Sequence, residues 1–330
     1  MVRGRGPGES EFAISNEDSF NDAISARPAT KFIVAQVIVR VPYARICAWS
    51  WRALTHIRRL REVLRLLARD PLFSEMLQSN PRFGYKFLTD NYLARGFSVS
   101  EAASCFLHHY RRLRSLLPDR LLRQILLDEV TLHTIPHGSD RFALTLGLSR
   151  PYDNEGELTL RLRVNGDIVY VLSFTIVPGR VVESSDSGAF LITRLQGIRG
   201  CFRQIGIASR ALNAVAPDRL LLAALQGIAE AFGVRAIVAI AAHRQTSYKG
   251  ANSTAFKNAY DNFFSERGFS KSGTGFFSAM VPMEQKPLSS IKRGHRLRAK
   301  KKRAFKYQIQ MACARFFESS EVDDAPESSN

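Results

Sequence analysis

The chain has 330 residues, of which 45% are hydrophobic and 23% are charged, as in a globular protein that buries a sizeable core. Lysine and arginine exceed aspartate and glutamate by 47 − 30 = 17. This excess favours polyanionic partners, namely nucleic acid, anionic lipid or phosphorylated ligands, although a basic protein without such a partner is the alternative.

The sequence argues against several classes of protein. The four cysteines are scattered, without a Cys-x-x-Cys pair or a histidine at ligand spacing, so we expect neither a zinc site nor a disulfide framework: Cys47, Cys105, Cys201 and Cys313. Residues 1–21 lack the apolar core of a signal peptide, and the apolar run 32–39 is far shorter than the ~20 residues that span a bilayer. We therefore expect a cytoplasmic protein that is not transmembrane.

The first part of the chain reads as a polar lead followed by helices. Residues 1–30 show no periodicity and are predicted to be disordered, and residues 31–135 are predicted to form a helical region. Ser100 is expected to cap one helix, and Pro118 with Asp119 to begin the next. Apolar stripes mark the helical faces: Ile57, Leu60, Leu64 and Leu67 on one helix, and Phe106, Leu113 and Leu117 on another.

After His133 the spacing of apolar residues changes from the helical pattern to the alternation that is typical of strands. Asn165-Gly166, between two alternating runs, predicts a tight hairpin. The strands are expected at residues 142–148, 158–164, 169–177 and 190–195. Helices at 206–215 and 217–232, a buried strand at 236–242, a helix at 255–267 and a strand at 275–281 complete a predicted domain over residues 136–282. A basic amphipathic helix is expected within 283–317, and an acidic disordered tail at 318–330.

This order predicts an α+β fold, with a mixed, mainly antiparallel sheet covered by helices. It is similar to the GCN5-related acyltransferase (GNAT) fold. The two helical pieces between 206 and 232, separated at Pro217, depart from that pattern.

An ordered set of short motifs runs from Pro81 to Lys306. It comprises His109-Tyr110, Glu155-Gly156-Glu157-Leu158, residues 170–174, Leu195-Gln196-Gly197, Tyr260-Asp261 with Glu266 and Gly268, Phe276-Phe277 and Lys292-Arg293. In this set the chain resembles the bacterial VirK/YbjX family. It departs where relatives read like Ala-Thr-Lys, Arg-Pro-Lys and Tyr-Asp-x-Phe-Trp: this chain has Ala208-Ser209-Arg210, Ala216-Pro217-Asp218 and Tyr260-Asp261-Asn262-Phe263-Phe264.

The resemblance implies a cellular context without a mechanism. Members of the family are associated with virulence, resistance to antimicrobial peptides and stress responses in Gram-negative bacteria, and the family brings no established catalytic residues. Our first hypothesis is therefore a cytoplasmic protein that acts through interaction or regulation. Its rival is an acyl-CoA-dependent acyltransferase.

The acyltransferase hypothesis has its own candidate residues. Arg203, Gln204, Gly206 and Ala208 fit the Arg/Gln-x-x-Gly-x-Gly/Ala pattern of acyl-CoA-binding loops, in which free N–H groups at a helix start hold a pyrophosphate. A plain helix start with a packing glycine is the alternative. His243 and Tyr248, at the end of a buried strand, are the candidate catalytic base and acid, against a histidine that simply sits at the rim of the core.

Other polar residues fit ordinary structural roles better. Glu155 and Glu157 flank a glycine and could act as a base or hold a cation, but we expect a solvated turn there. His108 and His109 are adjacent on a helix and point apart, so they cannot share a metal. Asp261 and Glu266 share no helical face.

The segment 292–306 holds nine lysines and arginines, and it forms the candidate polyanion site. Leu297, Phe305, Ile309 and Phe316 could form an apolar stripe on the same helix, so that a helix docked on the sheet with its cations in water is the alternative. The acidic tail could also cover these cations. The candidate polyanion ligands are Lys292, Arg293, Arg296, Arg298, Lys300, Lys301, Lys302 and Arg303.

Overall fold

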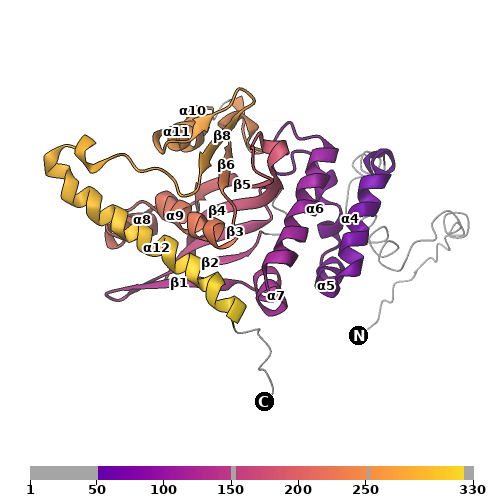
Figure 1. The fold of residues 1–330 in the computed structure, drawn as a ribbon, viewed down its shortest axis with the longest axis horizontal. Helices are drawn as coiled ribbons and strands as arrows, with labels where there is room; N and C mark the ends of the chain where they lie inside the picture. Colours follow the sequence, from indigo (N-terminus) through magenta and orange to yellow (C-terminus); the bar gives the residue numbers. More distant parts are fainter. Residues whose placement is uncertain (1–50, 150–153, 251–252, 323–330) are drawn as a thin grey trace, which may run out of the picture.

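A computed structural model describes residues 51–149, 154–250 and 253–322. The predicted disordered lead, the apolar run 32–39 and residues 323–330 of the predicted acidic tail lie outside these residues. The prediction of a disordered tail from 318 is wrong for residues 318–322, which continue the last helix. At the centre is an eight-stranded sheet in the order β1-β2-β3-β4-β5-β6-β8-β7, with helices along its sides (Figure 1). The predicted α+β class with a mainly antiparallel sheet is confirmed.

Helices form the first part of the described chain, as predicted. They are α4 (Ile57–Arg69), α5 (Pro71–Ser79), the 3₁₀ turns η1 (Pro81–Gly84) and η2 (Lys86–Leu88), α6 (Val99–Leu116) and α7 (Asp119–Leu127). The cap of α6 is Ser98, not Ser100 as expected. Ser98 lies three residues before Glu101, so the two side chains satisfy each other's backbone N–H groups in a capping box.

The strands β1 (Val130–His137), β2 (Asp140–Leu148), β3 (Leu158–Val164), β4 (Asp167–Pro178) and β5 (Gly188–Gly197) form an antiparallel meander. The predicted hairpin is present, and Asn165 and Gly166 both take positive φ, 52° and 96°, as a type I′ turn requires. Strand β1 was expected to be part of the helical region. Its alternation begins only three residues after α7 and includes Pro136, which is tolerated because β1 is an edge strand.

The second half of the domain crosses over from β5 to β6 (Ala236–Ile240) through α8 (Phe202–Ala211) and α9 (Pro217–Ala231). Helix α8 begins at Phe202, earlier than the predicted residue 206. The predicted helix at 255–267 is divided into α10 (Ser253–Phe256), the π-helix η6 (Lys257–Asn262) and α11 (Phe263–Glu266). The remaining elements are η3 (Gly179–Val182), η4 (Ala242–Arg244), β7 (Ser270–Lys271), β8 (Phe276–Met280), η7 (Leu288–Ser290) and η8 (Arg293–His295).

The last helix, α12 (Arg296–Val322), packs alongside α9 (Figure 1). A Cβ on Gly227 of α9 would lie 2.1 Å from the backbone oxygen of Gln310, so the contact needs glycine. Ile309, Cys313 and Phe317 are buried there, whereas Leu297 is 67% exposed. The expected apolar stripe is therefore wrong at Leu297, because the first turns of α12 extend past the body of the domain.

Among the described residues, none of the helices combines the length and the apolar character that crossing a bilayer requires.

Candidate functional site

The adjacent strands β5 and β6 run parallel and separate at their carboxyl ends. They pair over three positions, Phe190 with Ile237 to Ile192 with Ala239, and then β5 continues to Gly197 while β6 ends at Ile240. On its other side β5 carries a bulge, since Ile192 opposes Phe174 and Arg194 opposes Ser173, which leaves Thr193 as an extra residue. Bulges of this kind re-aim strand residues and are frequent beside active sites.

The separation leaves the N–H of Leu195 without a strand partner. It donates instead to the hydroxyl of Tyr260 at 3.3 Å. Tyr260 is only 4% exposed, stacks on Phe256 and belongs to the π-helix η6, a conformation that is rare and often found at functional sites. Burial raises the pKa of the Tyr260 hydroxyl, so it keeps its proton at neutral pH.

Polar side chains gather beside this gap. One oxygen of Glu155 accepts from Thr246 Oγ1 at 2.5 Å and from Ser247 Oγ at 3.2 Å, and the other lies 3.7 Å from Arg194 Nε. With its amide oxygen turned to Arg194, Gln196 accepts from both Nη2 and Nε, at 2.7 Å and 2.9 Å. The ends of β5 and β6 thus hold a carboxylate, a guanidinium, an amide, hydroxyls and a backbone donor.

Glu157, two residues after Glu155, is completely buried. Its Oε1 lies 2.9 Å from Lys86 Nζ and accepts a hydrogen bond from the Tyr92 hydroxyl, and its Oε2 accepts from the Tyr110 hydroxyl at 2.5 Å. Burial raises the pKa of both tyrosines, so both remain donors. The expected solvated turn is wrong for Glu157, because α6 and the 86–92 segment cover the end of β3.

Gly156 sets the directions of the two glutamates. Its φ is +114°, and a Cβ would come within 2.9 Å of Ser173 Cβ and 3.0 Å of the Phe174 nitrogen. Glycine alone fits both requirements. The backbone therefore presses against β4, sending Glu157 into the core and Glu155 to the strand ends.

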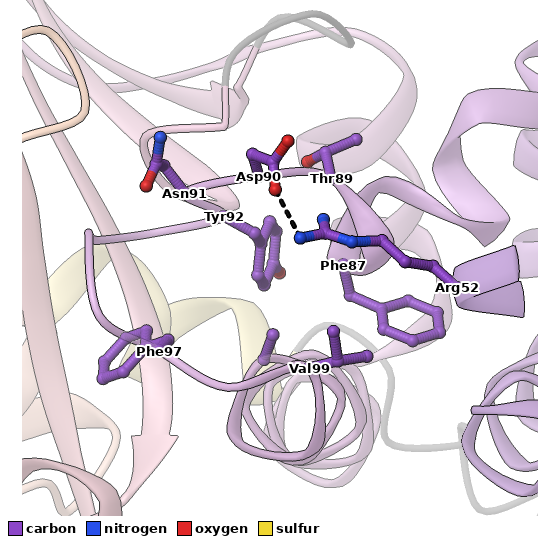
Figure 2. Close-up of a pocket in the computed structure, with 9 residues that line it drawn as sticks. Arg52, Phe87, Thr89, Asp90, Asn91, Tyr92, Phe97 and Val99 are labelled. Atoms are coloured by element: carbon purple, nitrogen blue, oxygen red, sulfur yellow. Dashed lines mark ion pairs between the residues drawn. The ribbon is translucent and has the colours of Figure 1, made fainter. Parts of the chain in front are cut away.

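The loop that carries Tyr92 is strained on both sides of that residue. Asn91 and Leu93 have φ values of 59° and 63°, which non-glycine residues rarely adopt. The N–H of Leu93 donates to the Asn154 carbonyl at 2.7 Å, which ties the loop to the Glu155 segment. Beside Tyr92 lies a hollow of about 120 Å³, with the Arg52–Asp90 ion pair at one side and Phe87, Phe97 and Val99 around it (Figure 2).

The predicted catalytic pair lies on the loop that holds Glu155, but its two members have different neighbours. His243 is exposed and its ring lies against Gly275, where a Cβ would come within 2.7 Å of it. Tyr248 packs on Phe256, with ring centroids 5.8 Å apart, and its carbonyl accepts from Arg95 at 2.6 Å. Tyr248 therefore adjoins Ser247 and the gap more closely than His243 does.

The predicted cofactor residues lie within α8 and not in a loop. The N–H of Ile205 already donates to the Cys201 carbonyl at 2.9 Å, so the free donors at the helix start belong to residues 202–204. Arg203 is exposed and Gln204 is half-buried, whereas Ala208 is buried. Gly206 faces Arg210, with 3.6 Å between its would-be Cβ and Nη1.

The predicted polyanion residues form the exposed start of α12 and the turn before it. Two of them hold the preceding loop: Arg296 donates to the carbonyls of Ile291 and Ser289, and Arg303 to that of Lys286. The side chains of Lys300 and Lys301 are exposed. Burial lowers the pKa of Lys302, and Arg298 and Arg219 lower it further.

These residues differ in how clearly the sequence pattern marks them. An arginine and a glutamine inside an apolar strand, Arg194 and Gln196, could have been noticed from the pattern. Nothing local marks Tyr260 or the burial of Glu157, since both depend on segments far apart in the chain. In the part of the chain that the structure describes, no group of three or more His, Cys, Asp or Glu residues is placed to hold a metal.

Comparison with known protein families gives a match over most of the chain. Residues 43–314 match the family described as "Protein of unknown function (DUF535)", which is also known as VirK/YbjX. No curated protein and no solved structure matches. Because the match spans most of the chain, and as the ordered motifs had indicated, this protein is a member of the VirK/YbjX (DUF535) family.

Proposed function

We propose that this protein transfers an acyl group from acyl-CoA to an amine at the separated ends of β5 and β6. The observation that carries the proposal is the N–H of Leu195, which points into the gap instead of pairing with β6. A thioester carbonyl can accept from such a donor. The order of the strands and the gap between β5 and β6 also support a GNAT-like fold.

The site contains a side chain or backbone group that could serve each step of the reaction. The amine nitrogen attacks the thioester carbon, and Leu195 N–H stabilises the negative charge that develops on the carbonyl oxygen. Glu155 takes the proton that the amine loses. The carbon–sulfur bond then breaks, and the departing thiolate takes the proton of the Tyr260 hydroxyl, which Glu155 restores. The products are an amide and free CoA, and no nucleophile from the protein is required.

The residues proposed from the sequence fit around this centre. Tyr248 and His243 lie on the loop of Thr246 and Ser247, and we assign them to the side from which the amine enters. Arg203 and Gln204 lie at the start of α8, just after β5, and we assign them, with Gly206 and Ala208 behind them in the helix, to the acyl-CoA side. The hydroxyl of Tyr260 must turn away from Leu195 before a thioester can bind.

The test measures thiol release from acetyl-CoA and longer acyl-CoAs with small amines and lysine peptides as acceptors. Glu155→Gln should lower turnover about a hundredfold or more while acyl-CoA still raises the melting temperature. Glu75→Gln on α5, a carboxylate that is paired with Arg123 and belongs to neither proposed site, is the matched control and should retain full turnover. If millimolar acyl-CoA leaves the wild-type melting temperature unchanged and no thiol is released, the proposal is wrong.

A matched pair on α8 tests the acyl-CoA side. Arg203→Glu places a repelling charge at the start of the helix, whereas Arg210→Glu places the same charge at its end. The first should weaken the thermal shift with acyl-CoA and the second should not. Equal shifts in both variants would remove the α8 start from the site.

We also propose polyanion binding as a second candidate function, because the first turns of α12 extend past α9 (Figure 1). These turns carry exposed cations. Replacing Arg298, Lys300 and Lys301 with glutamine should flatten the slope of log K against log salt for DNA or anionic vesicles. An unchanged slope would exclude this segment.

We propose a cytoplasmic role in bacterial stress response or virulence, in particular resistance to antimicrobial peptides, on the ground of family membership. Survival of a deletion strain exposed to such a peptide, complemented with the wild-type protein or with Glu155→Gln, tests this. Rescue by the wild type alone ties the role to the site around Glu155. Rescue by both supports an interaction or regulatory role, and rescue by neither contradicts the assignment.

A further inference from the structure

A group of cations gathers where α9, α11 and α12 meet. Arg219 lies near the start of α9, Arg267 follows α11, and Lys302 and Lys306 lie on α12. Helices α9 and α12 run side by side, with Gly227 against Gln310 and with Gln310 donating to Glu230 at 2.7 Å. This alignment places the start of α9 beside the turn of α12 that carries Lys302 and Lys306.

The positive charge of this cluster is poorly compensated. Arg267 pairs with the exposed carboxylate of Glu266 at 3.3 Å. In the described chain, no carboxylate forms an ion pair with Arg219, Lys302 or Lys306, which interact electrostatically with one another. Burial lowers the pKa of Lys306, and Arg219, Arg303, Arg267 and Lys302 lower it further. Half-burying a lysine among like charges costs free energy, which a bound anion would recover.

Arg267 is the fixed member of the cluster. Its guanidinium lies 3.6 Å from the centroid of the Phe263 ring, its Nη1 donates to the Phe263 carbonyl at 2.7 Å, and its side chain is 15% exposed. Its Nε is buried and has no hydrogen-bond partner. A preorganised guanidinium with an unused donor suits an oxyanion such as phosphate.

There is space for a ligand beside Arg267. A hollow of about 640 Å³, within the range of small-molecule sites, is bordered by Arg267, Ser270, Ser278 and Lys286. Two carboxylates, Glu183 and Glu284, border it as well. A nucleoside could occupy this hollow while its phosphates meet the cations.

Tyr170 connects the cluster with the gap between β5 and β6. It pairs with Gly197, the last residue of β5, and its ring lies 3.4 Å from where a Gly197 Cβ would be. Its hydroxyl interacts electrostatically with Asp218 and Arg267 on the side of the cluster and with Tyr260 on the side of the gap. One extended ligand could therefore reach both places.

We propose that Arg219, Arg267, Lys302 and Lys306 bind the phosphates of a nucleotide, and that this nucleotide is the 3′-phosphorylated ADP end of acyl-CoA. The second part rests on the proposed acyl transfer, whereas the phosphate site does not. Two carboxylates in the surroundings are unfavourable. Asp218 accepts the N–H of Arg219 at 2.6 Å, and Glu266 pairs with Arg267 at 3.3 Å, so both would repel the phosphates.

The test titrates adenosine 3′,5′-bisphosphate into the full-length protein by calorimetry. The double variant Arg219→Gln/Lys302→Gln should bind about a hundredfold more weakly, roughly tenfold for each charge removed, and should lose most of the salt dependence. The double variant Arg61→Gln/Arg65→Gln removes the same charge from exposed positions of α4, which takes no part in either proposed site, and should bind within about twofold of wild type. Asp218→Asn should bind more tightly.

The outcomes separate the two proposals. No binding by the wild type, or equal weakening in both double variants, overturns the phosphate site, whatever the enzyme assay shows. Binding that depends on the cluster without any release of thiol from acyl-CoA keeps the site and overturns acyl transfer. If acyl transfer occurs but nucleotide binding is unaffected by the changes in the cluster, acyl transfer stands and the phosphate site is overturned. Melting curves of each variant without ligand establish that it is folded, and Asp218→Asn, which removes no cation, provides an independent readout.

Discussion

The carboxylate of Glu157 and the ammonium of Lys86 form an ion pair at 2.9 Å in the interior, where Glu157 is fully buried and the Lys86 side chain is 4% exposed. The pair joins β3 to the turn η2, and the hydroxyls of Tyr92 and Tyr110 complete the coordination of the carboxylate. Because every oxygen of Glu157 is used, the charge is tolerated.

Removing one member of this pair should be severely destabilising. Glu157→Gln leaves the ammonium of Lys86 buried without a counter-charge, and we expect a loss of about 3–5 kcal/mol in the free energy of unfolding, measured by urea denaturation. Glu266→Gln removes an exposed carboxylate paired with Arg267 and should cost less than about 1 kcal/mol. A loss below about 1 kcal/mol for Glu157→Gln would contradict the role given to the pair.

Gly156→Ala should destabilise the protein more than the same change at Gly166. Both glycines have positive φ, but a Cβ at Gly156 would collide with β4, whereas nothing lies within 4 Å of one at Gly166. We expect a loss of about 1 kcal/mol at Gly166 from backbone strain and at least 1–3 kcal/mol more at Gly156 from overpacking. Thermal melting of the two variants makes the comparison, and equal losses would show that β4 yields to the methyl group.

Stability should fall as the pH drops from 7 towards 5, with His109 as one cause. Burial lowers the pKa of His109 well below its ordinary value of 6.5, and its Nδ1 accepts the N–H of Ile176 at 3.1 Å. Below pH 6.5 the unfolded chain therefore binds a proton at this histidine that the folded chain does not bind. The stabilisation is complete above pH 6.5 and is lost as the pH falls below it.

The variant His109→Asn retains an acceptor and removes this titration. Its free energy of unfolding at pH 7 should be lower than that of the wild type, but it should change less between pH 7 and pH 5. His108 and His133, whose pKa values burial also lowers, account for part of the remaining slope. A slope that is unchanged in the variant would exclude His109 as a cause.

Gly227→Ala should loosen α12 from α9. A methyl group at this position would lie 2.1 Å from a backbone oxygen of α12, which cannot move without the whole helix. We expect faster amide hydrogen exchange over residues 305–317 and a loss of about 1–3 kcal/mol in stability. Gly273→Ala, between β7 and β8, with nothing within 4 Å and no positive φ, should leave exchange in α12 unchanged.

The local pattern of the sequence was sufficient for most elements. Strand β3 and the start of α9 lie where the periodicity and Pro217 predicted them, and Asn165-Gly166 formed the expected turn. The spacing of apolar residues, helix caps and turn residues each act over a few positions, so the elements that they determine can be predicted from neighbouring residues alone. The family was also evident, because the ordered motifs are a property of the chain itself.

The tertiary structure decided which polar residues are buried and which of them meet. Glu157 resembles any surface glutamate until α6 and the 86–92 segment cover it, and Tyr260 reaches Leu195 from 65 residues away. The separation of β5 from β6 depends on the bulge at Thr193 and on the early end of β6. Neither feature can be predicted from the alternation of apolar and polar residues along one strand. Desolvation and strand pairing are long-range effects, so the site emerged only when distant segments were brought together.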